Sequence, residues 1–376
     1  MKLDTLCVHG ASFSEETGAV SVPIYQSVTF KHPSLGQSTG FDYSRMQNPT
    51  RLALEKTIAT LECGAEGFAY SSGMAAISNI LELFNPGDHI IASTDLYGGI
   101  IRYFRTISEK NGLSFSYINT ADLDALNLAI TKKTKALFIE TPTNPMMDIT
   151  DIEAVSRIAK KHNLILIVDN TFLSPYFQQP LKIGADIVVH SASKYLAGHN
   201  DTLAGLAVLK DVGLAEKLRF IYKTIGGCLA PLDSWLVLRG IKTLALRMLR
   251  QEENAMKIAL FLSSHKRVKK LYYAGLPTHP GFEIMQKQTT GFGGMISFEV
   301  DTATAAANVL SRIKIIAFAE SLGGVESLMT YPSVQTHGDI PESERNARGI
   351  NDRLLRLSVG VEDIEDLIAD LDRALL

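Results

Sequence analysis

Short apolar runs recur through the middle of the chain, separated by stretches whose apolar residues are spaced as on one face of a helix. The runs are GFAY (67–70), HIIAS (89–93), FSYI (115–118), ALFIE (136–140), LILIVD (164–169), DIVVH (186–190) and LAGLAVL (203–209). Residues 149–163 illustrate the helical spacing, with Ile152, Val155 and Ile158 on one face. Strands that are apolar throughout, rather than alternating, are covered on both faces. The pattern predicts an α/β fold with a mostly parallel sheet between helices.

The two ends of the chain follow other patterns. Residues 1–46 combine turn residues with short β-like pieces and lack helical periodicity, so we expect an arm rather than a domain. After about residue 233 a long helical stretch precedes two strand candidates, 294–300 and 354–359, and a C-terminal amphipathic helix. We therefore expect an arm (1–46), a large domain (47–245) and a smaller C-terminal α/β domain (246–376).

Charge and cysteine content argue against several functional classes. The 376 residues carry a net charge of -3 with no long run of one sign, which disfavours binding to nucleic acid or to an anionic membrane. The three cysteines and nine histidines are scattered, without the spacing of a disulfide framework or a metal site. The first residues lack the apolar core of a signal peptide, and no apolar run could span a bilayer. We expect a cytoplasmic protein.

Two polar residues, Asp169 and Lys194, each follow an apolar strand candidate. They lie 25 residues apart (194 − 169), one β-α-β step, so both should meet at the same edge of the sheet. Taken alone, Asp169 is equally a helix cap, a metal ligand or a partner for a cationic ligand, and Lys194 an ordinary surface lysine. Together they match pyridoxal phosphate, which needs a lysine for its aldehyde and an acid for its ring nitrogen.

Three further segments suit a cofactor and its substrate. In YSSGMAAISNILELF (70–84) a strand ends, Ser72 and Gly73 follow, and a helix begins; the free N–H groups there bind phosphate, with a simple serine cap as the alternative. Tyr97, in DLYGG, is either a ring that stacks on a flat cofactor or a core tyrosine. Arg356 lies within apolar LLRLSVG, where it either clamps a carboxylate or forms an internal salt bridge.

At this point the chain shows a family resemblance. The stretch DIVVHSASKYLAGHN (186–200) resembles the pyridoxal-phosphate lysine signature of the cystathionine γ-synthase family of Cys/Met-metabolism enzymes. Similar blocks occur in family order along nearly the whole chain: FDYSRMQNPTR, YSSGMAA, DLYGG, ETPTNP, VDNTF, AESLGGVESL and LLRLSVGVED. The resemblance implies a large domain of the aspartate-aminotransferase type, pyridoxal 5'-phosphate as cofactor, a small amino-acid substrate, and a homotetramer of tight dimers.

The resemblance also implies roles for the matching residues. Lys194 would hold the cofactor covalently and shuttle protons, Asp169 would pair with the ring nitrogen, and Tyr97 would stack on the ring and assist elimination. The phosphate would be held by Ser72, Gly73, Met74, Ser191 and Ser193, and by Tyr43 and Arg45 from the arm of the neighbouring subunit. The substrate would be fixed by Asn144, Ser321 and Arg356, with Arg356 on its α-carboxylate.

Three positions depart from patterns seen in the family. The usual threonine before the lysine is Ser193, which keeps the hydroxyl. Tyr222 and Lys223 replace a common Gln-Asn pair, a change that can alter substrate contacts. Gly99 stands where similar methionine γ-lyases usually carry cysteine, which counts against that reaction.

Acidic residues beside the site bear on the reaction. Glu320 and Asp42 resemble acids of γ-synthases and γ-lyases, whereas β-lyases usually lack the acid before Ser321. An acid at position 320 can bind the amine of a cysteine moiety, with a solvated or salt-bridged carboxylate as the alternative. The blocks STGFDYSR, GHND and TYPSVQTH look most like bacterial γ-synthases. We expect γ-replacement on an O-acyl-homoserine with cysteine or sulfide; elimination, as by a cystathionine γ- or β-lyase, is the alternative.

Two other functional classes are more remote alternatives, a serine hydrolase and a non-catalytic binding protein. GQSTG (36–40) fits the nucleophile motif of serine hydrolases around Ser38, but the residues before and after it predict neither the strand nor the helix that such an elbow needs. A non-catalytic protein that keeps the fold and only binds a partner is the other, although all the chemical positions are filled.

Overall fold

A seven-stranded sheet forms the centre of the molecule. The computed structural model describes residues 1–10, 18–338 and 340–376. The strands follow the order β1-β7-β6-β5-β4-β2-β3 across the sheet. Their bounds are β1 (Glu66–Tyr70), β2 (His89–Ser93), β3 (Ser114–Ile118), β4 (Thr134–Glu140), β5 (Ile165–Asp169), β6 (Ile187–Ser191) and β7 (Gly205–Leu209). Each apolar run of the sequence therefore forms a strand, as predicted.

The sheet is mostly parallel, and β7 is the exception. β7 pairs antiparallel with β1 on one side and with β6 on the other, whereas the pairs from β6 through β5, β4 and β2 to β3 are parallel. The carboxyl ends of β4, β5 and β6 consequently lie at one edge, where the strands end in Glu140, Asp169 and Ser191. In parallel α/β sheets this edge is where ligands bind.

Helices cover both faces of the large sheet. Successive residues of β5 show this, because Leu166 and Val168 pack in one hydrophobic core and Ile167 packs in the other. The first core is closed by α2 (Pro49–Glu62), α6 (Ile152–Lys161) and α10 (Pro231–Ile241), and the second by α3 (Gly73–Leu81), α4 (Gly98–Tyr103) and α9 (Val212–Ile225). The shorter helices here are η1 (Phe104–Ser108), α5 (Leu123–Ala129), α7 (Ser174–Phe177) and α8 (Pro180–Ile183). Two covered faces explain why the strand sequences are apolar throughout.

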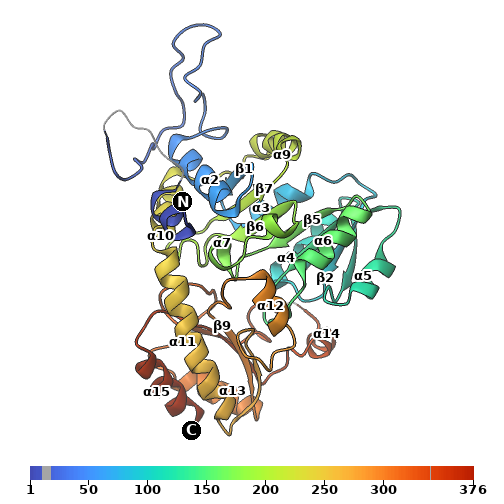
Figure 1. Cartoon of the computed structure of the whole chain (residues 1–376), viewed down its shortest axis with the longest axis vertical. Helices are drawn as coiled ribbons and strands as arrows, with labels where there is room; N and C mark the ends of the chain where they lie inside the picture. The colour runs from blue at the N-terminus through green and yellow to red at the C-terminus, as the bar shows by residue number, and fades with distance from the viewer. Residues whose placement is uncertain (11–17, 339) are drawn as a thin grey trace.

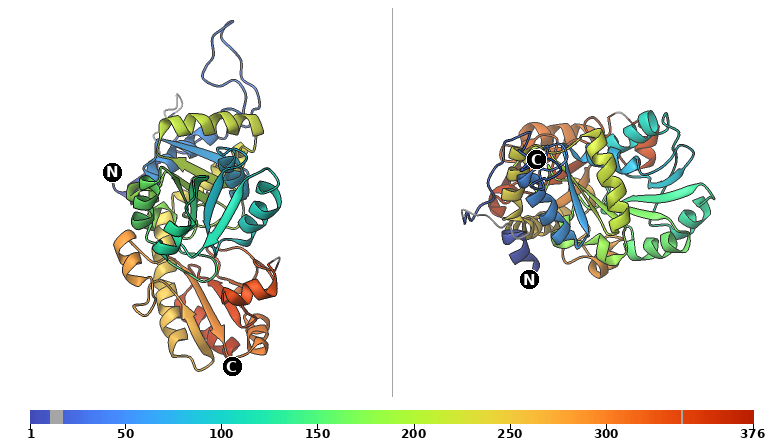
Figure 2. Two further views of the ribbon diagram at one scale, coloured as in Figure 1. Left: turned by 90° about the vertical axis from the view of Figure 1, so that its right-hand side faces the viewer. Right: turned by 90° about the horizontal axis from the view of Figure 1, so that it is seen from above.

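The C-terminal part forms a second, five-stranded sheet at the end of the molecule away from the N-terminal loop (Figure 2). Its order is β10-β11-β12-β9-β8, with β8 (Val268–Tyr272), β9 (Met295–Val300), β10 (Ala317–Phe318), β11 (Leu328–Thr330) and β12 (Leu354–Ser358). The helices are α11 (Leu244–Ser264), α12 (Phe282–Gln288), α13 (Ala303–Arg312), α14 (Glu342–Ala347) and α15 (Ile364–Leu375). The predicted smaller α/β unit is therefore present, and α11 runs along it from the large sheet (Figure 1).

Two sequence-based expectations about helices were wrong. The stretch after residue 233 is not one helix, because α10 ends at Ile241 and α11 begins at Leu244. The first residues do form a helix, α1 (Leu3–His9), which packs against α2 and α11. Seven residues are too few for helical periodicity to stand out, and packing against the body stabilises them instead.

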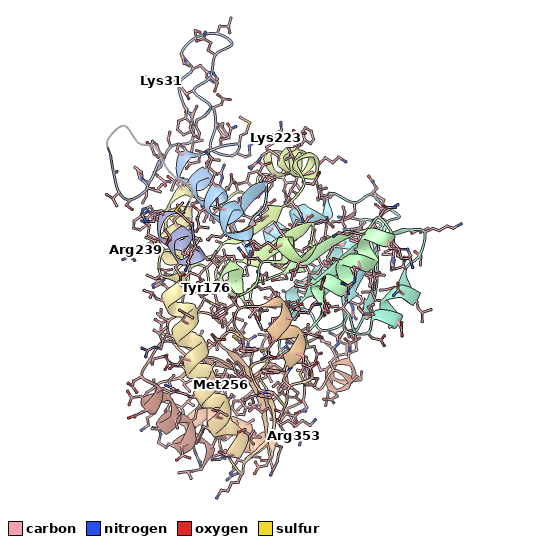
Figure 3. The ribbon with its side chains drawn as sticks, in the orientation of Figure 1. Lys31, Tyr176, Lys223, Arg239, Met256 and Arg353 are labelled. Carbon is pink, nitrogen blue, oxygen red and sulfur yellow. The ribbon has the colours of Figure 1, made fainter. Side chains whose placement is uncertain are left out.

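Residues 18–48 form a loop before α2, and its outer part stands clear of the body (Figure 1). Lys31 lies on this loop and Lys223 lies on the nearby helix α9 (Figure 3). Within the loop, Thr29 and Tyr43 form an isolated antiparallel β-bridge, and the chain then leads into α2. The limits of the arm at residue 46 and of the large domain at residue 245 stay predictions. No described helix is long and apolar enough to cross a membrane.

Candidate active site

A cavity of about 310 Å³ opens between the carboxyl edge of the large sheet and the C-terminal sheet. This volume suits a small organic ligand. The predicted residues that line it are Ser72, Gly73, Met74, Tyr97, Asn144, Asp169, Ser191, Ser193, Lys194, Glu320, Ser321 and Arg356. The structure thus gathers side chains that are up to 284 residues apart in sequence (356 − 72) into one pocket.

The start of α3 forms one end of the pocket. Ser72 is the N-cap of this helix, and its hydroxyl oxygen accepts the N–H of Ala75 at 3.0 Å. The first amides of a helix have no partner within it, so those of Gly73 and Met74 are available to an anion. A Cβ on Gly73 would lie 3.0 Å from Cβ of Ser191, so glycine lets the end of β6 approach the helix start. Ser72 is therefore a helix cap, and its role in binding phosphate stays a prediction.

Lys194 lies deeper in the pocket, just after β6. Its Nζ donates a hydrogen bond to Oγ of Ser321 at 2.9 Å. The pKa of Lys194 is lowered to about 8, mostly by burial and also by the Arg356 charge, while Glu320 partly opposes both effects. A fraction of the amine is therefore unprotonated, and hence nucleophilic, near neutral pH.

Asp169 ends β5 and is almost fully buried. Its Oδ1 accepts hydrogen bonds from N of Thr171 at 3.0 Å and from Oγ1 of Thr171 at 2.5 Å. Burial raises the pKa of Asp169, and the bonds from Thr171 and the nearby His190 offset part of the rise. A buried carboxyl of this kind is stabilised as an anion when a cation comes beside it.

Arg356 enters the pocket from β12 and is only 1% exposed. Its Nη1 donates to Oδ1 of Asn144 at 2.8 Å, and its Nη2 donates to O of Ser321 and to Oγ1 of Thr330, both at 3.0 Å. Its Nε is buried without a hydrogen-bond partner in the described part of the chain. All its bonds go to neutral groups, so the internal salt bridge considered from the sequence is not formed among the described residues. A buried guanidinium of this kind is suited to an anionic ligand.

Tyr97 begins α4 with its side chain 41% exposed, so it is not a core tyrosine. Its backbone N–H donates to Oε2 of Glu140 at 3.0 Å. A Cβ on Gly99 would lie 2.5 Å from Cε1 of Tyr97, so the ring lies directly against this glycine. A cysteine at position 99 would therefore require the Tyr97 ring to move.

The three arm residues do not reach the pocket of their own chain. Oδ1 of Asp42 accepts the hydroxyl of Ser38 at 2.5 Å on the exposed loop, Tyr43 is 42% exposed, and Nη1 of Arg45 donates to O of Lys223 at 3.2 Å. Ser38 lies in irregular chain without a strand before it or a helix after it, so the context of a hydrolase nucleophile is missing.

Tyr222 is not a substrate contact within this chain. The side chain is fully buried, and its hydroxyl donates to O of Ala69 at 2.8 Å. The ring packs edge-on against Tyr70 beneath the sheet. At Tyr222 the departure from the family pattern is therefore a change in the core, whereas Lys223 is exposed.

Sequence reasoning missed several lining residues: Ile77, Ile100, Glu140, Thr171, Phe172, Leu203, Leu322 and Thr336. Glu140 had a usable signal, because it ends an apolar strand as Asp169 does. Thr171 lies two residues after Asp169. Leu203 and Thr336 lie in irregular segments, and hydrophobic periodicity does not predict the path of such segments.

The pocket fits pyridoxal phosphate in three respects. Gly73, which has no side chain, exposes the backbone amides at the start of α3 to a phosphate. Lys194 provides a partly buried amine for the aldehyde, and Asp169 provides a buried carboxyl for the ring nitrogen. The orphaned Nε of Arg356 adds a place for a carboxylate. The fold and this site define a pyridoxal-phosphate-dependent enzyme of the aspartate-aminotransferase type.

Comparison with known proteins identifies the family. Residues 4–376 match the family model described as Cys/Met metabolism PLP-dependent enzyme. The chain is 51% identical over 374 residues to cystathionine beta-lyase of Lactococcus lactis subsp. cremoris, covering 99% of this chain and 98% of that one. It is 51% identical over 366 residues to cystathionine gamma-synthase/O-acetylhomoserine (thiol)-lyase of Bacillus subtilis, covering 97% and 94%.

A solved structure agrees with these relatives. The crystal structure of cystathionine gamma-lyase from Lactobacillus plantarum complexed with L-serine superposes with a TM-score of 0.98 at 49% identity, covering 100% of this chain and 98% of that one. The chain belongs to the Cys/Met-metabolism family of pyridoxal-phosphate-dependent enzymes. It is an enzyme that uses pyridoxal phosphate, and its relatives include cystathionine synthases and lyases at nearly equal identity.

The lowered pKa of Lys194 predicts how cofactor-free protein captures pyridoxal phosphate. Only the unprotonated amine attacks an aldehyde, so the capture rate should rise with pH through a midpoint near the lysine pKa of about 8, rather than near the ordinary value of 10.5. Stopped-flow absorbance across a pH series measures this, with free Nα-acetyl-lysine as the control. A midpoint equal to that of the free amine would contradict the environment described for Lys194.

Proposed function

We propose that this protein catalyses γ-replacement on an O-acyl-homoserine, with cysteine or sulfide as the nucleophile and cystathionine or homocysteine as the product. Glu320 is the observation that carries the proposal. Its exposed carboxyl lines the pocket next to Ser321, and within the described residues it forms no hydrogen bond or ion pair. An unpaired acid at this place suits the ammonium group of an incoming cysteine.

In this proposal Lys194 holds the cofactor covalently and moves the proton on the α-carbon of the substrate. Pyridoxal phosphate, when bound, supplies a sink for the electrons left by that proton. Asp169 would pair with the ring nitrogen, and Tyr97 would lie against the ring and assist departure of the acyl group. The Ser321 hydroxyl, which accepts from Nζ of Lys194 at 2.9 Å, keeps the amine aimed into the pocket.

The two ends of the ligand are held by different parts of the chain. We propose that the phosphate is bound by Ser72, Gly73 and Met74 at the start of α3 and by the hydroxyls of Ser191 and Ser193. The substrate carboxylate is bound by Arg356 and Asn144, which are already joined by a 2.8 Å hydrogen bond. This bond fixes the guanidinium before the substrate arrives, which reduces the ordering required on binding.

The arm completes the site from a neighbouring subunit in this proposal. Tyr43 and Arg45 lie in the loop before α2 and do not line the pocket of their own chain, as a contribution to another chain requires. Asp42 accompanies them. We propose a cytoplasmic homotetramer built from two tight dimers, each with two shared sites.

Product analysis tests the reaction. Holoenzyme supplied with O-acetyl- or O-succinylhomoserine and cysteine should form cystathionine, and with sulfide it should form homocysteine. If no cystathionine forms while added cystathionine is cleaved readily, the protein is a lyase and the proposal fails. Elimination is the second candidate because a β-lyase and a γ-lyase match this chain as closely as a γ-synthase does.

The matched variant Glu320→Gln sharpens the same assay. Sulfide has no amine, so removal of the carboxylate charge should raise KM for cysteine about 10-fold and leave KM for sulfide within about 2-fold. Equal losses with both nucleophiles would show that Glu320 does not bind the amine.

A further inference from the structure

Glu140 is a buried residue of the pocket whose carboxyl has no assigned role in binding the cofactor or the substrate. It ends β4, is 5% exposed, and lines the cavity with Asp169 and Tyr97. Glu140 and Asp169 are direct partners in the pairing of β4 with β5, so their side chains stand side by side at the carboxyl edge of the sheet. Two carboxyls buried together do not both ionise readily.

Both ends of the segment from β2 to α4 are bonded to Glu140. The backbone N–H of Glu140 donates to Oγ of Ser93, the last residue of β2, at 3.4 Å. Its Oε2 accepts the backbone N–H of Tyr97 at 3.0 Å. Tyr97 is the residue immediately before α4, and its own side chain does not cap the helix, so this bond from Glu140 fixes the backbone where the helix starts. The path of residues 93–97, and with it the position of the Tyr97 ring, therefore depends on Glu140.

The charges around Glu140 favour its neutral form. Burial raises its pKa well above the ordinary value, and the adjacent Asp169 and then Asp95 raise it further. The backbone amides of Tyr97 and Asn144 oppose the rise in part. Arg356 is the nearby cation, and its hydrogen bonds go to Asn144, Ser321 and Thr330 rather than to Glu140.

We propose that Glu140 is a positioning residue: its carboxyl holds the backbone of Tyr97, and so sets the face of the pocket against which the cofactor ring would lie. The proposal rests on the cofactor assignment and on the place of Tyr97, and it holds equally for replacement and for elimination.

Three substitutions at one position test the proposal. Glu140→Gln keeps an oxygen acceptor for Tyr97 and has no charge, so it should behave like the parent enzyme. Glu140→Ala removes the acceptor, and Glu140→Asp keeps an acid whose reach is shorter by one methylene. The matched control is Glu299→Ala, because Glu299 is also buried on a strand, 1% exposed, but bonds to Tyr272 and Arg353 outside the pocket.

The readouts are cofactor affinity, kinetics and thermal stability. Affinity is measured on cofactor-free protein with pyridoxine phosphate, which has no aldehyde and so reports ring fit without the covalent link. Misplacement of the ring-stacking residue should weaken this binding and lower kcat/KM by about 10- to 100-fold in Glu140→Ala and Glu140→Asp. Glu140→Gln should stay within about 3-fold of the parent in both, because the hydrogen bond is kept. Glu299→Ala should lower the melting temperature and leave pyridoxine phosphate binding unchanged.

A double-mutant cycle with Tyr97→Ala shows whether Glu140 acts through Tyr97. Once the ring is gone, Glu140→Ala should cause no further loss of pyridoxine phosphate binding. Parent-like binding by Glu140→Ala, or by Glu140→Asp if the alanine variant does not fold, would overturn the proposal. So would a Gln variant as impaired as the Ala variant, because a charge would then matter instead of a hydrogen bond. None of these outcomes depends on whether cystathionine is formed or cleaved.

Discussion

Replacement of Lys194 by alanine should abolish both covalent cofactor binding and turnover. Among the described residues, Lys194 supplies the one side-chain amine that lines the pocket. The variant also lacks the group proposed to move the substrate proton, so kcat should fall by at least about 10,000-fold. The absorbance of the covalently bound cofactor should also disappear, while the cradle at α3 still binds pyridoxal phosphate reversibly.

Lys210→Ala is the matched control for this variant. Lys210 also follows a strand of the large sheet, but its Nζ donates to O of Leu181 at 3.1 Å and lies outside the pocket. Its removal should leave cofactor absorbance and kcat unchanged. Residual turnover of a Lys194→Ala preparation above the stated limit would mean that another group moves the proton.

Replacement of Arg356 by lysine should remove most of the recognition of the substrate carboxylate. Lysine keeps the positive charge but lacks the planar fork, and it cannot keep the hydrogen bonds to Asn144, Ser321 and Thr330 together. Loss of one partner from a buried charge pair costs about 2–5 kcal/mol, which corresponds to roughly 30- to 5,000-fold in kcat/KM. We expect most of the loss in KM.

The carboxamide analogue of the substrate separates recognition from folding. The parent enzyme should strongly prefer the acid, and Arg356→Lys should lose that preference while pyridoxal phosphate still binds. An equal loss of kcat/KM for the acid and the carboxamide would show that the substitution damages the site generally and that Arg356 does not bind the carboxylate.

Much of the fold follows from local pattern, because a doubly covered strand must be apolar throughout. This is why residues 164–169 and 186–190 predict β5 and β6 at nearly their true bounds. The antiparallel direction of β7 has no such signature, since its sequence is as apolar as that of its parallel neighbours. Helix α1 was missed because tertiary contacts with α2 and α11 stabilise it rather than its own periodicity.

The residues of the candidate site also divide into those with a local sequence signal and those that depend on tertiary structure. Lys194 and Asp169 could be predicted because each is a polar residue at the end of an apolar run or just after it. The same rule selects Glu140, yet its raised pKa and its bond to Tyr97 depend on which strands lie beside it, and no local pattern encodes the strand order. Asp42, Tyr43 and Arg45 stay predictions, since their proposed partners belong to another subunit.

The central claim is that Lys194 anchors pyridoxal phosphate in this pocket, and peptide mapping tests it most directly. Native enzyme is reduced with borohydride, which fixes the covalent link, and is then digested and analysed by tandem mass spectrometry. We predict that the cofactor is attached to Lys194, within HSASKYLAGHND (190–201). Attachment at a different lysine, or a native protein that carries no pyridoxal phosphate, would contradict the account.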